Sequence, residues 1–117
     1  MIAGQRYGFG KGRARKVGMN KTEAKYAAIL RAREIAGEVA FWRYECVKFK
    51  LADKCWFGVD FFVMLVDGTI EMHEVKGGFI HDDGGIIKLK AAAAQFPLRF
   101  IKATYKNKNT GWIYEEI

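Results

Sequence analysis

Hydrophobic and polar positions follow two different periods along this chain. Apolar residues spaced three and four apart predict two amphipathic helices, one over residues 20–38 and one over about 85–96. Runs rich in β-branched and aromatic residues predict strands between and after them, at 39–51, 55–66, 69–76, 98–105 and 112–114. The resulting order, α-β-β-β-α-β-β, predicts one α/β domain in which the helices pack on a mixed sheet.

Local signals support the ends of both predicted helices. Asn20 is a suitable N-cap for the first helix, and Glu23 stands at the third helical position, so that the two match a capping box. Gly37 is expected to end this helix, and Pro97 to end the second. The small apolar residues of the first helix are expected to form the side that packs on the sheet: Ala24, Ala27, Ala28, Leu30, Ala32, Ile35 and Ala36.

An aspartate interrupts the most apolar stretch of the chain. Asp60 lies inside the run 56–66, which an Asp67-Gly68 turn joins to a strand that ends Glu74-Val75-Lys76. A buried carboxylate without a partner costs several kcal/mol or becomes protonated. A divalent cation shared by Asp60 and Glu74 would lower this cost, and Mg²⁺ suits one or two carboxylates together with a phosphate.

Whether these acids share one face depends on the hairpin register. A strict two-residue turn pairs Val66 with Thr69 and places Asp60 opposite Val75, away from Glu74. A three-residue turn, or a bulge with Gly68 in the left-handed region, pairs Val66 with Ile70. Asp60 then lies opposite Lys76 and Glu74 opposite Phe62, all on one face. A functional site at the hairpin therefore requires this second register.

With that register, the chemistry of a metal-dependent phosphodiesterase follows. Asp60 and Glu74 would be ligands to Mg²⁺ or Mn²⁺, with the backbone carbonyl of Val75 as a further ligand. The metal would lower the pKa of a bound water and offset charge on the phosphate. Lys76 would orient or deprotonate the attacking water, and Lys88 would reach the same phosphate. Alone, Glu74 and Lys76 would favour a simple ion pair at a strand edge; Asp60 favours the site.

Charge is distributed unevenly. The net charge is +7, and residues 1–50 carry 12 Lys/Arg against 4 Glu, whereas residues 51–117 carry 8 Lys/Arg against 9 Asp/Glu. Residues 1–19 are rich in glycine and cations and predict a flexible basic arm, followed by the folded domain 20–117. Such asymmetry favours a polyanion as partner, and a solvated basic surface is the alternative. The expected DNA-binding residues are Arg6, Lys11, Arg13, Arg15, Lys16, Lys21, Lys88 and Lys90.

The cysteine count and the hydropathy bear on location. Cys46 and Cys55 are too few for a disulfide framework, and no run approaches the length of a membrane span. Together with the absence of a signal-peptide pattern, they indicate a cytoplasmic protein.

The motif residues resemble the PD-(D/E)XK nuclease superfamily, whose pattern is a helical Glu, a strand Asp, and Glu-x-Lys on the paired strand. The matching residues are Glu23, Asp60, Glu74 and Lys76, and the resemblance covers residues 20–105. Val59 stands where the motif name has proline. The chain is similar to small phage-encoded nucleases and to Holliday-junction resolvases, which act in DNA recombination.

The resemblance implies a restriction-endonuclease-like α-β-β-β-α-β core and a Mg²⁺-dependent endodeoxyribonuclease, with Mn²⁺ able to substitute. It implies branched DNA as substrate and a phage or prophage protein acting inside a bacterium. A homodimer is expected because a small chain with one site must pair to cut two strands symmetrically. The alternative function is a non-catalytic nucleic-acid-binding module on the same fold.

Several other candidate residues have a purely structural interpretation as well as a functional one. Glu23 is a metal-site residue under the resemblance and a helix cap under the capping-box pattern. One side chain is expected to serve only one of these roles, and the resemblance favours the metal site. His73 is expected in the core or on the surface rather than in catalysis, and His81 in a solvated loop. Glu45 is either an extra acid near the site or an exposed strand residue, and the exposed position is favoured. The tryptophans, Trp42, Trp56 and Trp112, are expected in the core or at interfaces rather than as base-stacking platforms.

Overall fold

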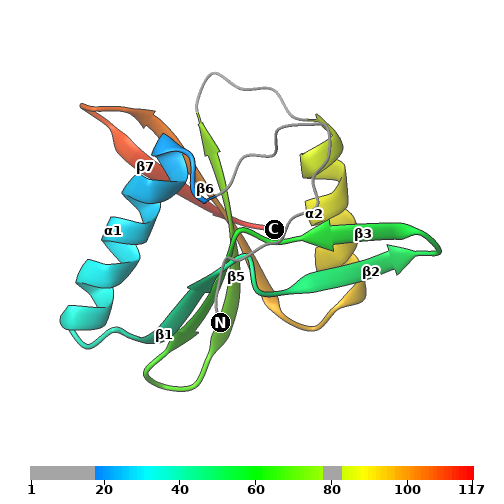
Figure 1. Ribbon diagram of the computed structural model, residues 1–117, viewed down its shortest axis with the longest axis horizontal. Helices are drawn as coiled ribbons and strands as arrows, with labels where there is room; N and C mark the ends of the chain where they lie inside the picture. Colours follow the sequence, from blue (N-terminus) through cyan, green and yellow to red (C-terminus); the bar gives the residue numbers. More distant parts are fainter. Residues whose placement is uncertain (1–17, 78–82) are drawn as a thin grey trace.

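A computed structural model describes residues 18–77 and 83–117 of the chain (Figure 1). The predicted arm over residues 1–19 lies almost entirely outside the described residues. So do its five expected DNA-binding cations, Arg6, Lys11, Arg13, Arg15 and Lys16, and the loop residue His81.

The described chain forms an α/β fold with a five-stranded mixed sheet. Its elements are α1 (Lys21–Ile35), β1 (Val39–Tyr44), β2 (Lys48–Ala52), β3 (Cys55–Gly58), β4 (Phe61–Leu65), β5 (Ile70–Gly77), α2 (Asp83–Gln95), β6 (Arg99–Asn107) and β7 (Gly111–Glu116). The sheet has the order β1-β4-β5-β6-β7, and β2 and β3 form a separate two-stranded ribbon. Only β5 and β6 pair in parallel, because α2 carries the chain back across the sheet. The predicted α/β class with a mixed sheet is confirmed.

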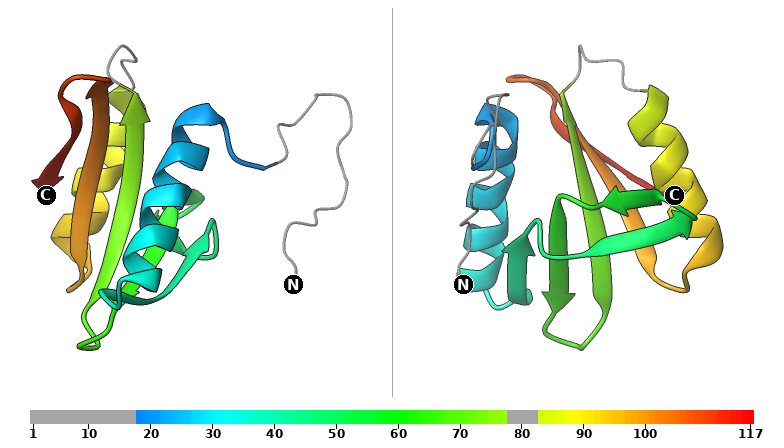
Figure 2. Two further views of the ribbon diagram at one scale, coloured as in Figure 1. Left: turned by 90° about the vertical axis from the view of Figure 1, so that its left-hand side faces the viewer. Right: turned by 45° about the vertical axis from the view of Figure 1, so that its right-hand side comes forward.

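Helices cover opposite faces of the sheet (Figures 1 and 2). On one face, Tyr26 and Leu30 of α1 are fully buried against Phe61, Val63 and the neighbouring strands. The other face is covered by α2 and by the β2–β3 ribbon. The core cluster on this face consists of Phe49, Phe57, Val59, Met72, Leu89, Ala92 and Phe100. Neither helix of the described chain is long and apolar enough to span a membrane.

The buried side of α1 agrees with the prediction at Leu30 and Ala27 and differs from it elsewhere. Its core contacts come from Tyr26 and Leu30, whereas Ala24, Ala28 and Ala32 are exposed and Ile35 is 82% exposed. The alanine-rich side was expected to allow close approach to the sheet. An aromatic and a leucine side chain bury more apolar area than alanine does, so they determine which side of the helix faces the sheet.

The two long strands predicted at residues 39–51 and 55–66 are each interrupted in the structure. Residues 39–51 divide into β1 and β2 at Glu45, whose φ of 48° no strand residue adopts. Residues 55–66 divide into β3 and β4 where Val59 and Asp60 leave the strand. The ribbon of β2 and β3 is thereby inserted between β1 and β4, which pair with each other in the main sheet.

The register required for a functional site places the correct residues on each face of the hairpin, but its residue pairing is wrong by two positions. Met64 pairs with Ile70 and Phe61 with His73, so the predicted pairing of Val66 with Ile70 is wrong. Gly68 adopts the expected left-handed conformation at φ 93°, and Leu65 N–H donates to the Thr69 carbonyl at 2.8 Å. A shift of two residues preserves the faces of a strand. Asp60 consequently comes beside Glu74 rather than beside Lys76.

Candidate functional site

Asp60 occupies a bend that is fixed from both sides by backbone contacts. Val59 before it is 1% exposed and Phe61 after it is fully buried, each in a different core cluster. The carbonyl of Asp60 accepts a hydrogen bond from Glu45 N–H at 2.8 Å. Because its neighbours are anchored on opposite faces of the sheet, the position of Asp60 is determined by the core.

The carboxylates of Asp60 and Glu74 lie together at this bend. Asp60 N–H donates to Glu74 Oε1 at 3.2 Å, and Val75 N–H donates to Asp60 Oδ2 at 2.8 Å. Lys76 Nζ lies 3.7 Å from Glu74 Oε2. The structure therefore brings together three of the four predicted catalytic residues, with the backbone of Val75 between them.

Burial and mutual repulsion perturb both carboxyl groups. Desolvation raises the pKa of Asp60 to about 7, and the nearby charges of Glu23 and Glu45 act in the same direction. Desolvation, followed by the charge of Asp60, raises the pKa of Glu74 to about 8. Lys76 and the backbone N–H donors lower both pKa values without cancelling the rise. Two adjacent groups with such pKa values are typical of a functional site.

The residues present fit a hard divalent cation. Two adjacent carboxylates that repel each other, beside a single lysine, gain further counter-charge when a cation binds between them, and oxygen donors are what Mg²⁺ and Mn²⁺ prefer. Within residues 18–77 and 83–117, no group of three or more His, Cys, Asp or Glu side chains converges on a possible metal position. A cation here would therefore be held by Asp60 and Glu74, which suits Mg²⁺ because it commonly keeps several waters.

Glu23 forms the capping box, and its charge also acts on the site. Asn20 N–H donates to Glu23 Oε1 at 3.0 Å, and Glu23 N–H donates to Asn20 Oδ1 at 2.8 Å. The hydroxyl of Tyr44 donates to the same Oε1 at 2.8 Å. The charge of Glu23 nevertheless raises the pKa of Asp60, so its carboxylate lies within electrostatic range of the pair. The cap is confirmed, and it does not remove Glu23 from the surroundings of the site.

The other described cations predicted to bind DNA are exposed. Lys21 begins α1, and Lys90 lies on the outer side of α2. Lys88, expected to reach the phosphate at the site, donates instead to the carbonyl of Trp56 at 3.1 Å. The structure thus places Lys88 against the β2–β3 ribbon.

A second polar cluster, which the sequence analysis did not find, is buried on the α1 face. His73 Nδ1 lies 2.6 Å from the Tyr26 hydroxyl, and His73 Nε2 lies 2.8 Å from Glu71 Oε1. Arg99 Nη1 donates to Glu71 Oε2 at 2.8 Å and also binds Glu116. The expectation that His73 belongs to the core is confirmed. The signal was the alternation of Glu71, His73 and Val75 on one side of β5.

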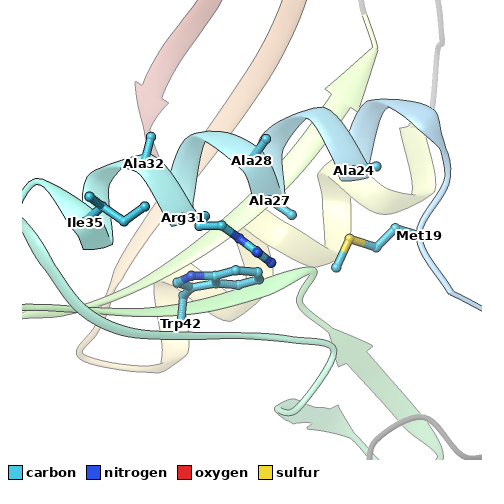
Figure 3. Close-up of a pocket in the computed structure, with 8 residues that line it drawn as sticks. All are labelled: Met19, Ala24, Ala27, Ala28, Arg31, Ala32, Ile35 and Trp42. Carbon is cyan, nitrogen blue, oxygen red and sulfur yellow. The ribbon is translucent and has the colours of Figure 1, made fainter.

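An apolar groove lies along α1 and over Trp42 (Figure 3). It is lined by Met19, Ala24, Ala27, Ala28, Arg31, Ala32, Ile35 and Trp42. Of the described residues that line it, none carries a carboxylate, an imidazole or a thiol, and Arg31 supplies a guanidinium.

Two neighbours of the site were missed or undervalued from the sequence. Tyr44 ends β1 and binds Glu23, and Glu45 was expected to be an exposed strand residue. Glu45 is exposed, but its charge contributes to the raised pKa of Asp60.

No protein-family model, curated protein or solved structure matches this chain, so the proposals below rest on its own residues and geometry.

Proposed function

We propose that this chain is a metal-dependent endodeoxyribonuclease that hydrolyses phosphodiester bonds, with branched DNA as its substrate. The observation that carries the proposal is the adjacent pair of carboxylates, half-buried Asp60 and buried Glu74, with Lys76 Nζ 3.7 Å from Glu74 Oε2. The order of elements also supports it: a helix, an antiparallel β1-β4-β5 meander, a second helix, and a strand parallel to β5.

Each residue has a separate task in this mechanism. Asp60 and Glu74 would hold Mg²⁺ or Mn²⁺ together with the Val75 carbonyl. When bound, the cation supplies Lewis acidity that offsets negative charge developing on the phosphate. Lys76, held beside Glu74, is positioned to orient the attacking water and to stabilise the phosphate oxygens. Glu23 contributes a further negative charge near the pair and helps to retain the cation.

The surroundings explain why a cation would be favoured over protons at neutral pH. The two carboxyl groups repel each other, and burial penalises both charges. Binding of one divalent cation offsets both charges at once. Protonation of both groups instead leaves two neutral acids that cannot bind the metal.

The test is cleavage of a labelled four-way junction beside a linear duplex of matched sequence, in Mg²⁺ and in EDTA. Asp60→Asn preserves shape and removes one ligand charge, so cutting should fall by at least about a hundredfold, as expected when a residue central to catalysis is lost. Asp67→Asn is the matched control, because Asp67 is an exposed acid in the β4–β5 turn that keeps its acceptor to Thr69 N–H as asparagine.

Three results separate the alternatives. Metal-dependent cutting of the junction alone, lost in Asp60→Asn, supports a junction-resolving enzyme. Cutting of both substrates supports a general nuclease. Tight binding without cutting in Mg²⁺ or Mn²⁺ refutes catalysis and favours the non-catalytic binding module. The same preparations report the proposed homodimer through their mass in solution, since symmetric cutting of a junction requires two sites.

A further inference from the structure

The two-stranded ribbon of β2 and β3 has one apolar side and one side that faces away from the protein. Inward residues such as Phe49 and Phe57 are buried with Leu89 and Phe100 in the core cluster beneath α2. The outward positions pair across the ribbon as Lys48 with Gly58 and Lys50 with Trp56. The register thus places two lysines and a tryptophan on one exposed surface.

Trp56 is unusually exposed for its size and position. Its exposed fraction is 49%, although the same ribbon buries Phe49 and Phe57 almost completely. Tryptophan rarely leaves so much of its ring in water when a core lies on the other side of the strand. An exposed indole ring at the middle of an ordered ribbon is suited to contact a flat partner.

Two lysines lie beside Trp56, one near its ring and one at its backbone carbonyl. Lys50 Nζ lies 5.9 Å from the centroid of the Trp56 ring, and Lys88 of α2 reaches the Trp56 carbonyl at 3.1 Å. Within residues 18–77 and 83–117, Lys48, Lys50 and Lys88 form no ion pair with an acid. By contrast, Lys102 and Arg99 on the opposite edge of the sheet pair with Glu115 and Glu116. The ribbon surface therefore has positive charge available for a polyanion.

The same ribbon leads directly into the candidate active site. β3 ends at Gly58, and Asp60 follows two residues later. Asp60 lies four positions after Trp56 in the sequence, a separation of at most about 14 Å even when the chain is extended. A nucleic-acid strand bound along the ribbon would therefore pass close to Asp60 and Glu74.

We propose that Trp56 is a stacking platform for an unpaired nucleobase, with Lys48, Lys50 and Lys88 binding the flanking phosphates. Aromatic side chains stack on any base, and lysines hold the backbone without reading sequence. The Lys88 ammonium has three donors, so its bond to the Trp56 carbonyl leaves others for a phosphate. The inference rests on the proposed function only for the class of ligand, which is nucleic acid. It adds that the ribbon binds the unpaired nucleotides of a branched substrate.

The test is binding of a dye-labelled oligothymidylate and of a blunt duplex, followed by fluorescence anisotropy in EDTA with the full chain. Trp56→Ala should weaken oligothymidylate binding by roughly 5- to 100-fold and duplex binding by much less, with Trp56→Phe recovering part of the loss. Lys50→Gln should reduce the dependence of log affinity on log salt by about 0.7, the value for one single-strand phosphate contact.

Phe41→Ala is the matched control, because Phe41 is an exposed aromatic (41%) on β1 outside the ribbon. The proposal is overturned if Trp56→Ala binds oligothymidylate within twofold of Phe41→Ala, or if it loses the same affinity for both nucleic acids. It is also overturned if the wild-type protein does not bind oligothymidylate. Omission of metal separates this result from catalysis, because binding in EDTA is measured whether or not the chain cleaves DNA.

Discussion

Asp60 and Glu74 are held side by side by two hydrogen bonds that run in opposite directions across the β4–β5 hairpin. The N–H of Asp60 donates to Glu74 Oε1, and the N–H next to Glu74, that of Val75, donates to Asp60 Oδ2. The backbone thus holds half-buried Asp60 and buried Glu74 together although their charges repel. Such an arrangement costs folding energy and is typical of sites kept for function rather than for stability.

The first prediction is that Asp60→Asn stabilises the fold at pH 8 in EDTA. Asparagine keeps an oxygen acceptor for Val75 N–H and removes the charge that raises the pKa of Glu74. A gain on the order of 1 kcal/mol would raise the melting temperature by about 4–8 °C. Thermal unfolding followed by circular dichroism measures it. The exposed-turn variant Asp67→Asn should show no such gain, and an equal gain there would contradict the explanation.

The second prediction concerns pH. The pKa values of Asp60 and Glu74 rise from the ordinary 3.8 and 4.5 to about 7 and about 8 on folding. The folded state therefore binds more protons than the unfolded state between these limits. Their contribution to stability is full below about pH 4 and is lost as the pH rises through the folded values. In EDTA, urea unfolding should report a decline on the order of a few kcal/mol between pH 5 and 8.5.

The double variant Asp60→Asn/Glu74→Gln serves as the control for this pH dependence. It lacks both titrating groups while keeping similar shape, so its free energy of unfolding should vary less over the same interval. A decline as steep as that of the wild type would show that other groups cause it.

The third prediction is that Mg²⁺ or Mn²⁺ stabilises the wild-type chain above pH 7. A ligand at a hundred times its dissociation constant adds about 2.7 kcal/mol to the free energy of unfolding. The cation competes with protons for Asp60 and Glu74, so the gain should be larger at pH 8 than at pH 6. Thermal shift with titrated metal measures it. An equal shift in Asp60→Asn would place the cation elsewhere.

Local sequence signals predicted the parts of the fold that depend on neighbouring residues. The capping box at Asn20 and Glu23, the end of the helix at Gly37 and the left-handed Gly68 all follow from short-range backbone requirements. The shared side of Asp60 and Glu74 was expected in only one of the two registers that the turn sequence allows, the one that a functional site requires. It survived an error of two residues in the pairing because such a shift preserves the faces of a strand.

The features that sequence reasoning missed depend on long-range packing. Nothing local distinguishes a continuous strand from one interrupted at Glu45 or at Asp60, because both sides retain strand composition. The outward position of Trp56 follows from how the ribbon docks on α2, and the contact of Tyr26 with His73 joins residues 47 positions apart. Hydrophobic periodicity records neither relationship.

The fourth prediction tests the buried cluster on the α1 face. Tyr26→Phe removes the hydroxyl that lies 2.6 Å from His73 Nδ1 and leaves a buried polar nitrogen without its partner. Such a loss destabilises a protein by about 1–3 kcal/mol. Tyr105→Phe is the matched control, because it removes a hydroxyl from a partly exposed tyrosine of β6. Urea unfolding compares the two, and equal effects would show that the hydroxyl–imidazole contact contributes little.

The last prediction separates the two roles of Glu23. Glutamine can complete a capping box as glutamate does, so Glu23→Gln should leave the melting temperature nearly unchanged. Because it removes the charge that raises the pKa of Asp60, it should weaken metal binding and DNA cleavage if Glu23 assists the site. Glu23→Ala should lose both functions and about 1 kcal/mol of stability, whereas Asn20→Ala should lose a similar stability while keeping the Glu23 charge. Melting temperature and metal affinity are measured on all three variants. Full metal affinity and cleavage in Glu23→Gln would assign Glu23 to the helix cap alone.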